Sequence, residues 1–273
     1  RATRVATAAA FDPARRVSEP VIARLDGKRR AIGGVAALCE AHALGTLPFR
    51  EARARLACPM NAPALAQLRR KLAADEPTYG LWVTLESATV TEMAVALGLD
   101  WVVIDAEHGH LDWREILDHL RAAVRSRTVA LVRLAELNAG LIKRALDIGA
   151  DGVVIPWIET PDELERAVAC AHYPPQGRRG IGGERATCWG RCLAEHVAES
   201  EANVLVVPII ESVRAAEQIE QICRVPGVEL LQLGPADFSS TAGFPGCWEG
   251  PGVAEQLLAI KEVVRRHGKQ CGV

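Results

Sequence analysis

Charged side chains follow the apolar stretch of four separate segments of this sequence. Asp105, Glu107 and His108 follow WVVI, Arg133 follows VALV, Glu211 follows VVPII and Asp237 follows LQLGPA. An isolated charge is costly to bury beside such apolar segments, so these groups should interact with one another or with a ligand. The pattern therefore predicts one site that combines carboxylates, an imidazole and a guanidinium.

Each residue type in this set indicates a particular chemical role. The carboxylates of Glu211 and Asp237 suit a hard divalent cation that keeps some water and takes further oxygens from a substrate. An imidazole titrates near neutral pH, so His108 could serve as a general base that a nearby carboxylate orients. Arg133 offers fixed cationic donors to an enolate oxygen or a carboxylate. The main-chain amides of one short segment could hold a substrate carboxylate: Gly234, Pro235, Ala236 and Asp237.

Structural roles compete with these chemical ones. Arg133 and Glu211 could form an ion pair across the mouth of a barrel, and His108 could be a core histidine with satisfied hydrogen bonds. We expect His110 and His119 to lie on a solvated loop and a solvated helix, away from the site.

The positions of the lysines argue against one mechanism. The chain has only five lysines, and none lies at the C-terminal end of a predicted strand. Lys143 and Lys261 fall on predicted helices, and Lys269 opens the last predicted strand. An aldolase that forms a Schiff base needs a desolvated lysine inside its barrel, so the sequence disfavours that mechanism.

The elements that must position the site alternate between strands and helices from about Pro63 onward. Strands are predicted at 81–87, 101–108, 129–136, 152–159, 203–212 and 228–237, and KQCGV begins a seventh. WVVID and GVVIP are continuously apolar, which is typical of parallel strands buried on both faces. Helical segments between such strands indicate right-handed crossovers.

This alternation predicts an α/β fold, a (β/α)8 TIM-type barrel over residues 63–273. Such a barrel takes about 250 residues and eight strands, so we expect truncation after the start of strand seven. Barrel active sites form at the C-terminal ends of the strands, where the charged residues lie. Residues 1–62 are expected to form a helical N-terminal extension without a chemical motif. No Gly-x-Gly-x-x-Gly follows the first strand, so a dinucleotide-binding fold loses its main support.

Composition excludes several classes of partner. The 273 residues include 32 lysines and arginines and 34 aspartates and glutamates. This near balance gives no electrostatic reason to expect binding to nucleic acid or to an anionic membrane. The longest strongly apolar run, 204–210, is far short of the roughly 20 residues that span a bilayer. Eight cysteines show neither a Cys-x-x-Cys pair nor zinc-site spacing, so we expect free thiols and a cytoplasmic location.

A series of motifs carries a resemblance to a known family. These are IDAEHGH, LVRLAE, IKRALDIGADGVVIPWIETPDE, HYPPQGRRGIG, PIIES and LGPADFSSTAGFPG. From about residue 65 to residue 273 the chain resembles the HpcH/HpaI family of metal-dependent (class II) pyruvate aldolases. The resemblance implies reversible cleavage of a 4-hydroxy-2-oxo acid into pyruvate and an aldehyde, so the expected partners are small molecules.

The same resemblance implies a role for each candidate residue. Glu211 and Asp237 match the two ligands of a divalent metal ion, usually Mg, Mn or Co. Arg133 matches the arginine that contacts the keto oxygen of pyruvate, His108 matches the catalytic histidine, and Asp105 matches an aspartate grouped with it. His108 would then take the proton of the 4-hydroxyl group through metal-bound water, while the metal and Arg133 stabilise the enolate.

Assembly and two departures also follow from the resemblance. Asp147 matches an aspartate that the family can present near a neighbouring subunit's site, and a hexamer built as a trimer of dimers is the expected homo-oligomer. Ile209 stands where family members often carry glutamine, which calls one polar contact near the pyruvate site into question. The family's eighth strand and exchanged C-terminal helix have no counterpart in this sequence.

Other activities compete with aldol cleavage. An acyl-CoA lyase and a citrate-type condensing enzyme of the same superfamily would use the same kind of enolate. A CoA lyase needs a surface that binds a nucleotide, and only the arginine-rich loop 177–191 is a candidate, although this loop more simply covers the barrel mouth. The third alternative is an inactive truncated barrel that acts as a binding protein. Metal binding would separate it from the enzymes, and CoA dependence would separate the enzymes from each other.

Overall fold

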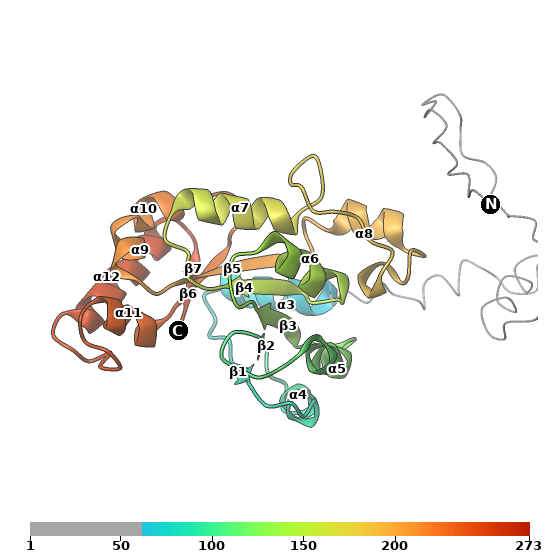
Figure 1. Cartoon of the computed structure of the whole chain (residues 1–273), viewed down its shortest axis with the longest axis horizontal. Coiled ribbons are helices and arrows are strands. Elements are labelled where there is room, and N and C mark those ends of the chain that lie inside the picture. The colour runs from blue at the N-terminus through green and yellow to red at the C-terminus, as the bar shows by residue number, and fades with distance from the viewer. Residues whose placement is uncertain (1–61) are drawn as a thin grey trace, which may run out of the picture. The chain divides into compact units, whose positions relative to one another are not determined.

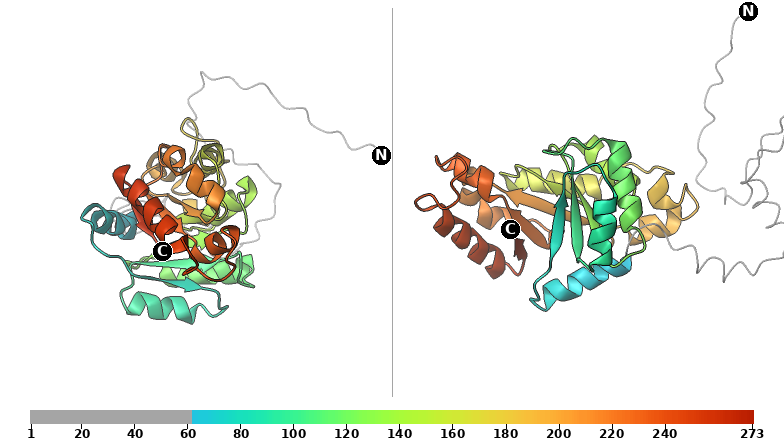
Figure 2. Two further views of the ribbon diagram at one scale, coloured as in Figure 1. Left: turned by 90° about the vertical axis from the view of Figure 1, so that its left-hand side faces the viewer. Right: turned by 90° about the horizontal axis from the view of Figure 1, so that it is seen from below.

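The computed structural model describes residues 62–273, in which parallel strands form a single curled sheet (Figures 1 and 2). The seven strands follow one another across the sheet in chain order: β1 (Gly80–Val83), β2 (Trp101–Asp105), β3 (Val129–Arg133), β4 (Gly152–Ile155), β5 (Leu205–Ile210), β6 (Leu230–Leu233) and β7 (Gln270–Gly272). All neighbouring strands are parallel. Their C-terminal ends therefore lie at a common rim.

Helices precede the sheet and connect its strands. They are α3 (Ala62–Ala73), α4 (Thr89–Ala96), α5 (Trp113–Ala123), α6 (Ala139–Asp147), α7 (Pro161–Ala171), the 3₁₀ turn η1 (Arg185–Thr187), α8 (Leu193–Glu199), α9 (Val213–Glu217), α10 (Ile219–Ile222), α11 (Pro235–Thr241) and α12 (Val253–Arg266). The start of α7 shows how local sequence sets a helix boundary. Thr160 accepts a hydrogen bond from the amide of Glu163, whose carboxylate accepts one from the amide of Thr160. This reciprocal capping satisfies amides that the helix itself leaves without acceptors.

The strands bury side chains on both faces, which explains their continuous hydrophobicity. Val102 and Ile104 of β2 belong to a core between the sheet and the helices. Val103 of the same strand belongs to a second cluster on the inner face of the curled sheet, together with Leu131 and Val207. Because successive side chains of a strand point to opposite faces, one apolar strand supplies both cores.

The inner cluster is covered by α3. Ala64, Leu65 and Leu68 are its buried residues, and all three belong to the inner cluster. The buried residues of the other described helices do not belong to that cluster. The guanidinium of Arg69 also donates to the carboxylate of Glu229, with Nε 2.9 Å from Oε1. Contacts with the inner face therefore come from the helix that precedes the first strand.

The curled sheet with alternating helices confirms the predicted barrel-type architecture, and β1 and β7 are its edge strands. All six predicted strands were too long, because each observed strand ends two to four residues earlier than expected. The segment 228–237 was expected to be a strand throughout, but β6 ends at Leu233 and α11 begins at Pro235. Proline favours the first position of a helix, where its missing N–H costs nothing. Asp237 therefore lies in the first turn of a helix and not at the end of a strand.

Other predictions meet the structure only in part. No helix within residues 62–273 is long and apolar enough to cross a membrane. Free thiols, as expected, are present at Cys170, Cys192, Cys223, Cys247 and Cys271. The predicted helical extension lies outside the described residues, apart from Ala62 at the start of α3.

Candidate active site

The C-terminal rim of the sheet surrounds a cleft of about 470 Å³. All but one of the predicted site residues line it: Asp105, His108, Arg133, Glu211, Gly234, Pro235, Ala236 and Asp237. They come from the ends of β2, β3 and β5, from Gly234 after β6 and from the first turn of α11. Parallel strands bring these distant segments to the same edge, so the predicted grouping of acids, imidazole and guanidinium is present.

Arg133 is fixed by two carboxylates and an aromatic ring. Its Nε lies 2.9 Å from Oδ1 of Asp105, and its Nη2 contacts Oδ2 of the same carboxylate. Its Nη1 lies 3.0 Å from Oε2 of Glu107, and its guanidinium carbon lies 4.6 Å from the ring centroid of Trp82. The predicted alternative of an ion pair with Glu211 is therefore wrong. Contacts on several sides leave the guanidinium little freedom, which suits a preorganised donor.

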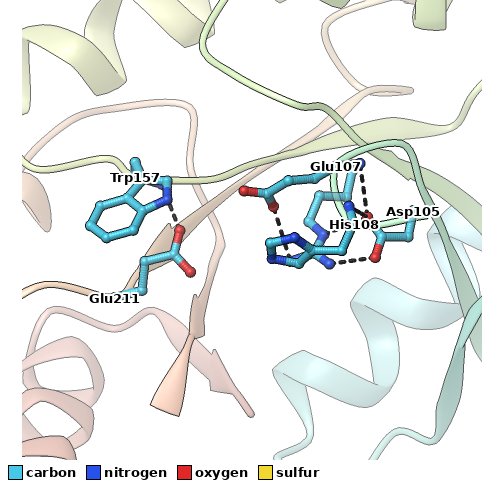
Figure 3. Close-up of polar contacts among 6 residues, drawn as sticks. Asp105, Glu107, His108, Trp157 and Glu211 are labelled. Atoms are coloured by element: carbon cyan, nitrogen blue, oxygen red, sulfur yellow. Dashed lines mark hydrogen bonds and ion pairs between the residues drawn. The ribbon is translucent and has the colours of Figure 1, made fainter. Parts of the chain in front are cut away.

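Asp105 also organises the main chain beside it (Figure 3). Its Oδ1 accepts hydrogen bonds from the amides of Glu107 at 3.0 Å and His108 at 3.2 Å. Burial raises the pKa of the Asp105 carboxyl, but the bonds from Arg133 and these amides outweigh that effect and leave the pKa below its usual range. Asp105 is thus an ionised acid that holds the His108 backbone. The His108 side chain itself is exposed in the cleft, so the alternative of a buried core histidine is wrong.

Glu211 is buried at the end of β5, on the far side of the close-up from His108 (Figure 3). Its Oε1 accepts a hydrogen bond of 2.7 Å from the amide of Trp157, whose φ of 53° lies in the left-handed region. A side chain at Gly234 would place its Cβ 2.5 Å from Oε2 of Glu211, so this position requires glycine. Strained backbone and a close approach of this kind are commonly found at functional sites.

The charge around Glu211 favours a bound cation. The pKa of Glu211 is raised to about 7, mainly by burial and also by the negative charges of Asp237 and Glu107, while the hydrogen bond from Trp157 opposes this shift. Residues 62–273 contain no group of three or more histidine, cysteine or acidic side chains that could hold a metal ion. A magnesium-like ion, however, is often held by only one or two carboxylates plus water and substrate oxygens. Glu211 and Asp237 fit such an ion, which would relieve their repulsion.

The segment 234–237 offers fewer amides than the sequence suggested. The amide of Gly234 donates to the carbonyl of Ile210 at 3.1 Å, and Pro235 has no N–H. The amides of Ala236 and Asp237 remain, in the first turn of α11, where a helix provides no acceptor of its own. Two donors, and not four, are therefore available to a substrate carboxylate.

Asp147 is the predicted residue that lies elsewhere. It ends α6, and its Oδ1 lies 2.8 Å from Nη2 of the buried Arg179. It does not line the cleft of its own chain, and its expected role beside a neighbouring subunit stays a prediction.

The two histidines placed outside the site differ in their surroundings. His110 is exposed, as expected, and its Nε2 lies 3.1 Å from a carboxylate oxygen of Glu86. His119 was expected on a solvated face, but it is fully buried. It bonds Oγ1 of Thr91 at 2.8 Å and the carbonyl of Leu85 at 3.0 Å. It therefore packs α5 against neighbouring segments.

Three contributors to the site have no role in the sequence-based hypothesis. Glu107 follows β2 and was visible as an acid, but only the structure shows it against Arg133. Trp82 occupies an apolar strand, where its sequence context is typical of core. Trp157 acts through its amide, which leaves no signal in the residue type.

Comparison with known proteins agrees with this geometry. Residues 78–273 match the HpcH/HpaI aldolase/citrate lyase family. The chain belongs to this family. A 4-hydroxy-2-oxovalerate aldolase of Rhodococcus jostii (strain RHA1) is 34% identical over 215 residues, which cover 78% of this chain and 83% of that relative.

Solved structures of related proteins share the fold of this HpcH/HpaI chain. A family member from Burkholderia cenocepacia J2315 is 34% identical with a TM-score of 0.71, covering 75% of this chain and 82% of its own. The citrate synthase SbnG is 27% identical with a TM-score of 0.67, covering 75% and 80%. The family resemblance expected from the motifs is therefore confirmed.

Proposed function

We propose that the protein is a divalent-metal-dependent aldolase that reversibly cleaves a 4-hydroxy-2-oxo acid into pyruvate and an aldehyde. The observation that carries the proposal is the common cleft, in which Arg133, His108 and the acids Glu211 and Asp237 face one another. The named activity of the Rhodococcus relative supports the same reaction class.

Each residue has a definite part in the proposed cleavage. His108 takes the proton of the 4-hydroxyl group as the bond between C3 and C4 breaks, and C4 becomes the aldehyde carbonyl. The electron pair of that bond passes to C3 and is delocalised as an enolate, whose oxygen receives hydrogen bonds from Arg133. Protonation of C3 then yields the methyl group of pyruvate. Asp105 acts through Arg133 and the main chain of His108, and the amides of Ala236 and Asp237 bind the substrate carboxylate.

A divalent cation such as Mg²⁺, Mn²⁺ or Co²⁺ held by Glu211 and Asp237 would act as a Lewis acid toward the 2-oxo group. The raised pKa of Glu211 and the nearby charge of Asp237 support this assignment.

Exchange of pyruvate protons tests the enolate chemistry without knowledge of the aldehyde. The protein is incubated with pyruvate in D₂O, and loss of the methyl signal is followed by NMR with Mg²⁺ or Mn²⁺ and then with EDTA. We expect exchange that depends on the metal and disappears in Arg133→Ala. A folded protein that has the metal but produces no exchange would rule out an active pyruvate aldolase.

Citrate-type condensation is the second candidate, because the structure of citrate synthase SbnG matches three-quarters of the chain. It would use an acetyl-CoA enolate with oxaloacetate as the electrophile. Citrate formation from these two compounds, without exchange of pyruvate protons, would favour this activity over aldol cleavage.

A further inference from the structure

The side chain of Gln232 places an amide among the apolar side chains on the inner face of the sheet. Gln232 of β6 pairs in register with Ile209 of β5 and with Gly272 of β7. Its strand neighbours Leu231 and Leu233 belong to the helix-facing core. Since side chains alternate along a strand, Gln232 points to the inner face.

Gln232 lies at the boundary between two cavities. It lines the catalytic cleft together with Ile209 and Arg133. It also lines a cavity of about 30 Å³ beneath the cleft, whose walls include Val103 and Leu131. The side chain of Gln232 therefore forms part of the floor of the catalytic cleft.

The amide of Gln232 has no hydrogen-bond partner in the part of the chain that the structure describes. The side chain of Gln232 is half-buried. It lies close to the main chain of β7, because a Cβ added to Gly272 would be 2.7 Å from Oε1 of Gln232. The amide opens on the cleft, where water or a ligand can bond to it, and it would be destabilising only if it had neither. Leucine or valine would fill the same place at less cost, as Ile209 does on the neighbouring strand.

We infer that Gln232 is a substrate-binding residue, whose side-chain N–H donates to the carboxylate of the 2-oxo acid. The inference rests on the proposed function. Gln232 stands two residues before Gly234, which follows β6, so it lines the cleft close to the first turn of α11, whose amides are free to bind that carboxylate. Arg133, on the other side of the cleft floor, is left to the keto oxygen.

Substitution of Gln232 by leucine and by glutamate tests the inference. Pyruvate binding to the full chain with Mg²⁺ is measured by ligand-observed NMR, and proton exchange is measured on the same samples. Gln232→Leu should weaken pyruvate binding about tenfold or more, the scale of one hydrogen bond to a charged group. Gln232→Glu should weaken it further, because a second carboxylate repels that of the ligand. Gln256→Leu makes the same change on α12, outside the cleft, and should leave pyruvate binding and proton exchange at the wild-type level.

Thermal unfolding separates substrate binding from a structural role. Gln232→Leu should keep or raise the unfolding midpoint, because it removes an amide that nothing bonds in the protein. A lower midpoint with unchanged pyruvate binding would overturn the inference. If the wild type binds pyruvate without exchanging its protons, the proposed function fails, and the binding comparison still decides the role of Gln232. If the wild type does not bind pyruvate, both fail.

Discussion

At the scale of single residues, the site places an exposed imidazole beside a rigid guanidinium. Arg133 is fixed by Asp105, Glu107 and Trp82, whereas the described residues provide no hydrogen bond to the ring of His108. A general base must turn toward its substrate, and an oxyanion donor must be fixed in advance. The difference in restraint between the two side chains fits the different roles proposed for them.

His108→Ala should slow aldol cleavage by roughly 100-fold or more, the usual contribution of a general base. Thermal stability should not change, because the side chain is exposed. His110→Ala removes the neighbouring exposed imidazole, which contacts Glu86, and should keep the rate of the wild type. Equal rates for the two variants would exclude His108 as the base.

Asp105→Asn should reduce both activity and the unfolding midpoint more than Glu107→Gln. Asp105 is almost fully buried and bonds Arg133 and two main-chain amides, while Glu107 interacts with Arg133 through one oxygen. Removing one partner of a buried ion pair costs about 3 kcal/mol or more when the other charge stays behind, and asparagine retains part of the hydrogen bonding. Pyruvate proton exchange and the thermal unfolding midpoint, measured for both variants, test which substitution has the larger effect. The reverse order would mean that Glu107 is the main anchor of Arg133.

At the scale of elements, α3 is a structural part of the barrel. Its leucines belong to the same cluster as the inner residues of the strands, and the cleft opens at the C-terminal ends of those strands. The helix thus supports the layer on which the catalytic groups stand. Sequence alone places this segment only next to the first strand.

Leu65→Ala should lower the free energy of unfolding by about 2–5 kcal/mol, because it leaves a cavity in the inner cluster. Urea denaturation measures this loss, and Arg70→Ala on the exposed face of α3 is the control. Leu65 makes no contribution to the cleft lining, so pyruvate exchange per folded molecule should change little. A loss below about 1 kcal/mol would mean that α3 is not packed on the strands as described.

At the scale of the whole molecule, buried histidines make the fold sensitive to acid. Burial lowers the pKa values of His119 and His172, and it lowers the pKa of His196 to about 4. Between about pH 6.5 and pH 4 the unfolded chain therefore binds protons that the folded chain excludes. Stability through these groups is present above pH 6.5 and falls as the pH is lowered.

The variant His196→Gln isolates one of these groups. Glu211, with its pKa raised to about 7, acts in the opposite direction, because the folded state then holds the extra proton. This contribution cancels when the wild type is compared with the variant. We expect the wild type to lose stability relative to His196→Gln by up to about 1.4 kcal/mol per pH unit below pH 6.5. Urea denaturation at a series of pH values measures the difference, and a constant difference would contradict the assigned pKa.

The sequence alone was enough to predict the parallel strands, the family and the charged residues that line the cleft. Continuously apolar strands and the charged residues that follow them are local patterns, and parallel pairing carries their ends to one rim. Only the tertiary structure decided which side chains interact and which are buried. Arg133 pairs with Asp105 and Glu107 and not with Glu211, His119 is buried, and Asp147 lies outside the cleft.

The physical reason is the range of the interactions. Hydrophobic periodicity extends over a few residues of one chain segment, so it can be recognised without knowledge of the fold. Ion pairs and burial depend on which segments meet and in which register. Gln232, for example, lies between Ile209 and Gly272 because β6 pairs with β5 and β7 in that register. Which carboxylates pair with Arg133, and that Gln232 lines the cleft, were therefore decided only when the strands assembled.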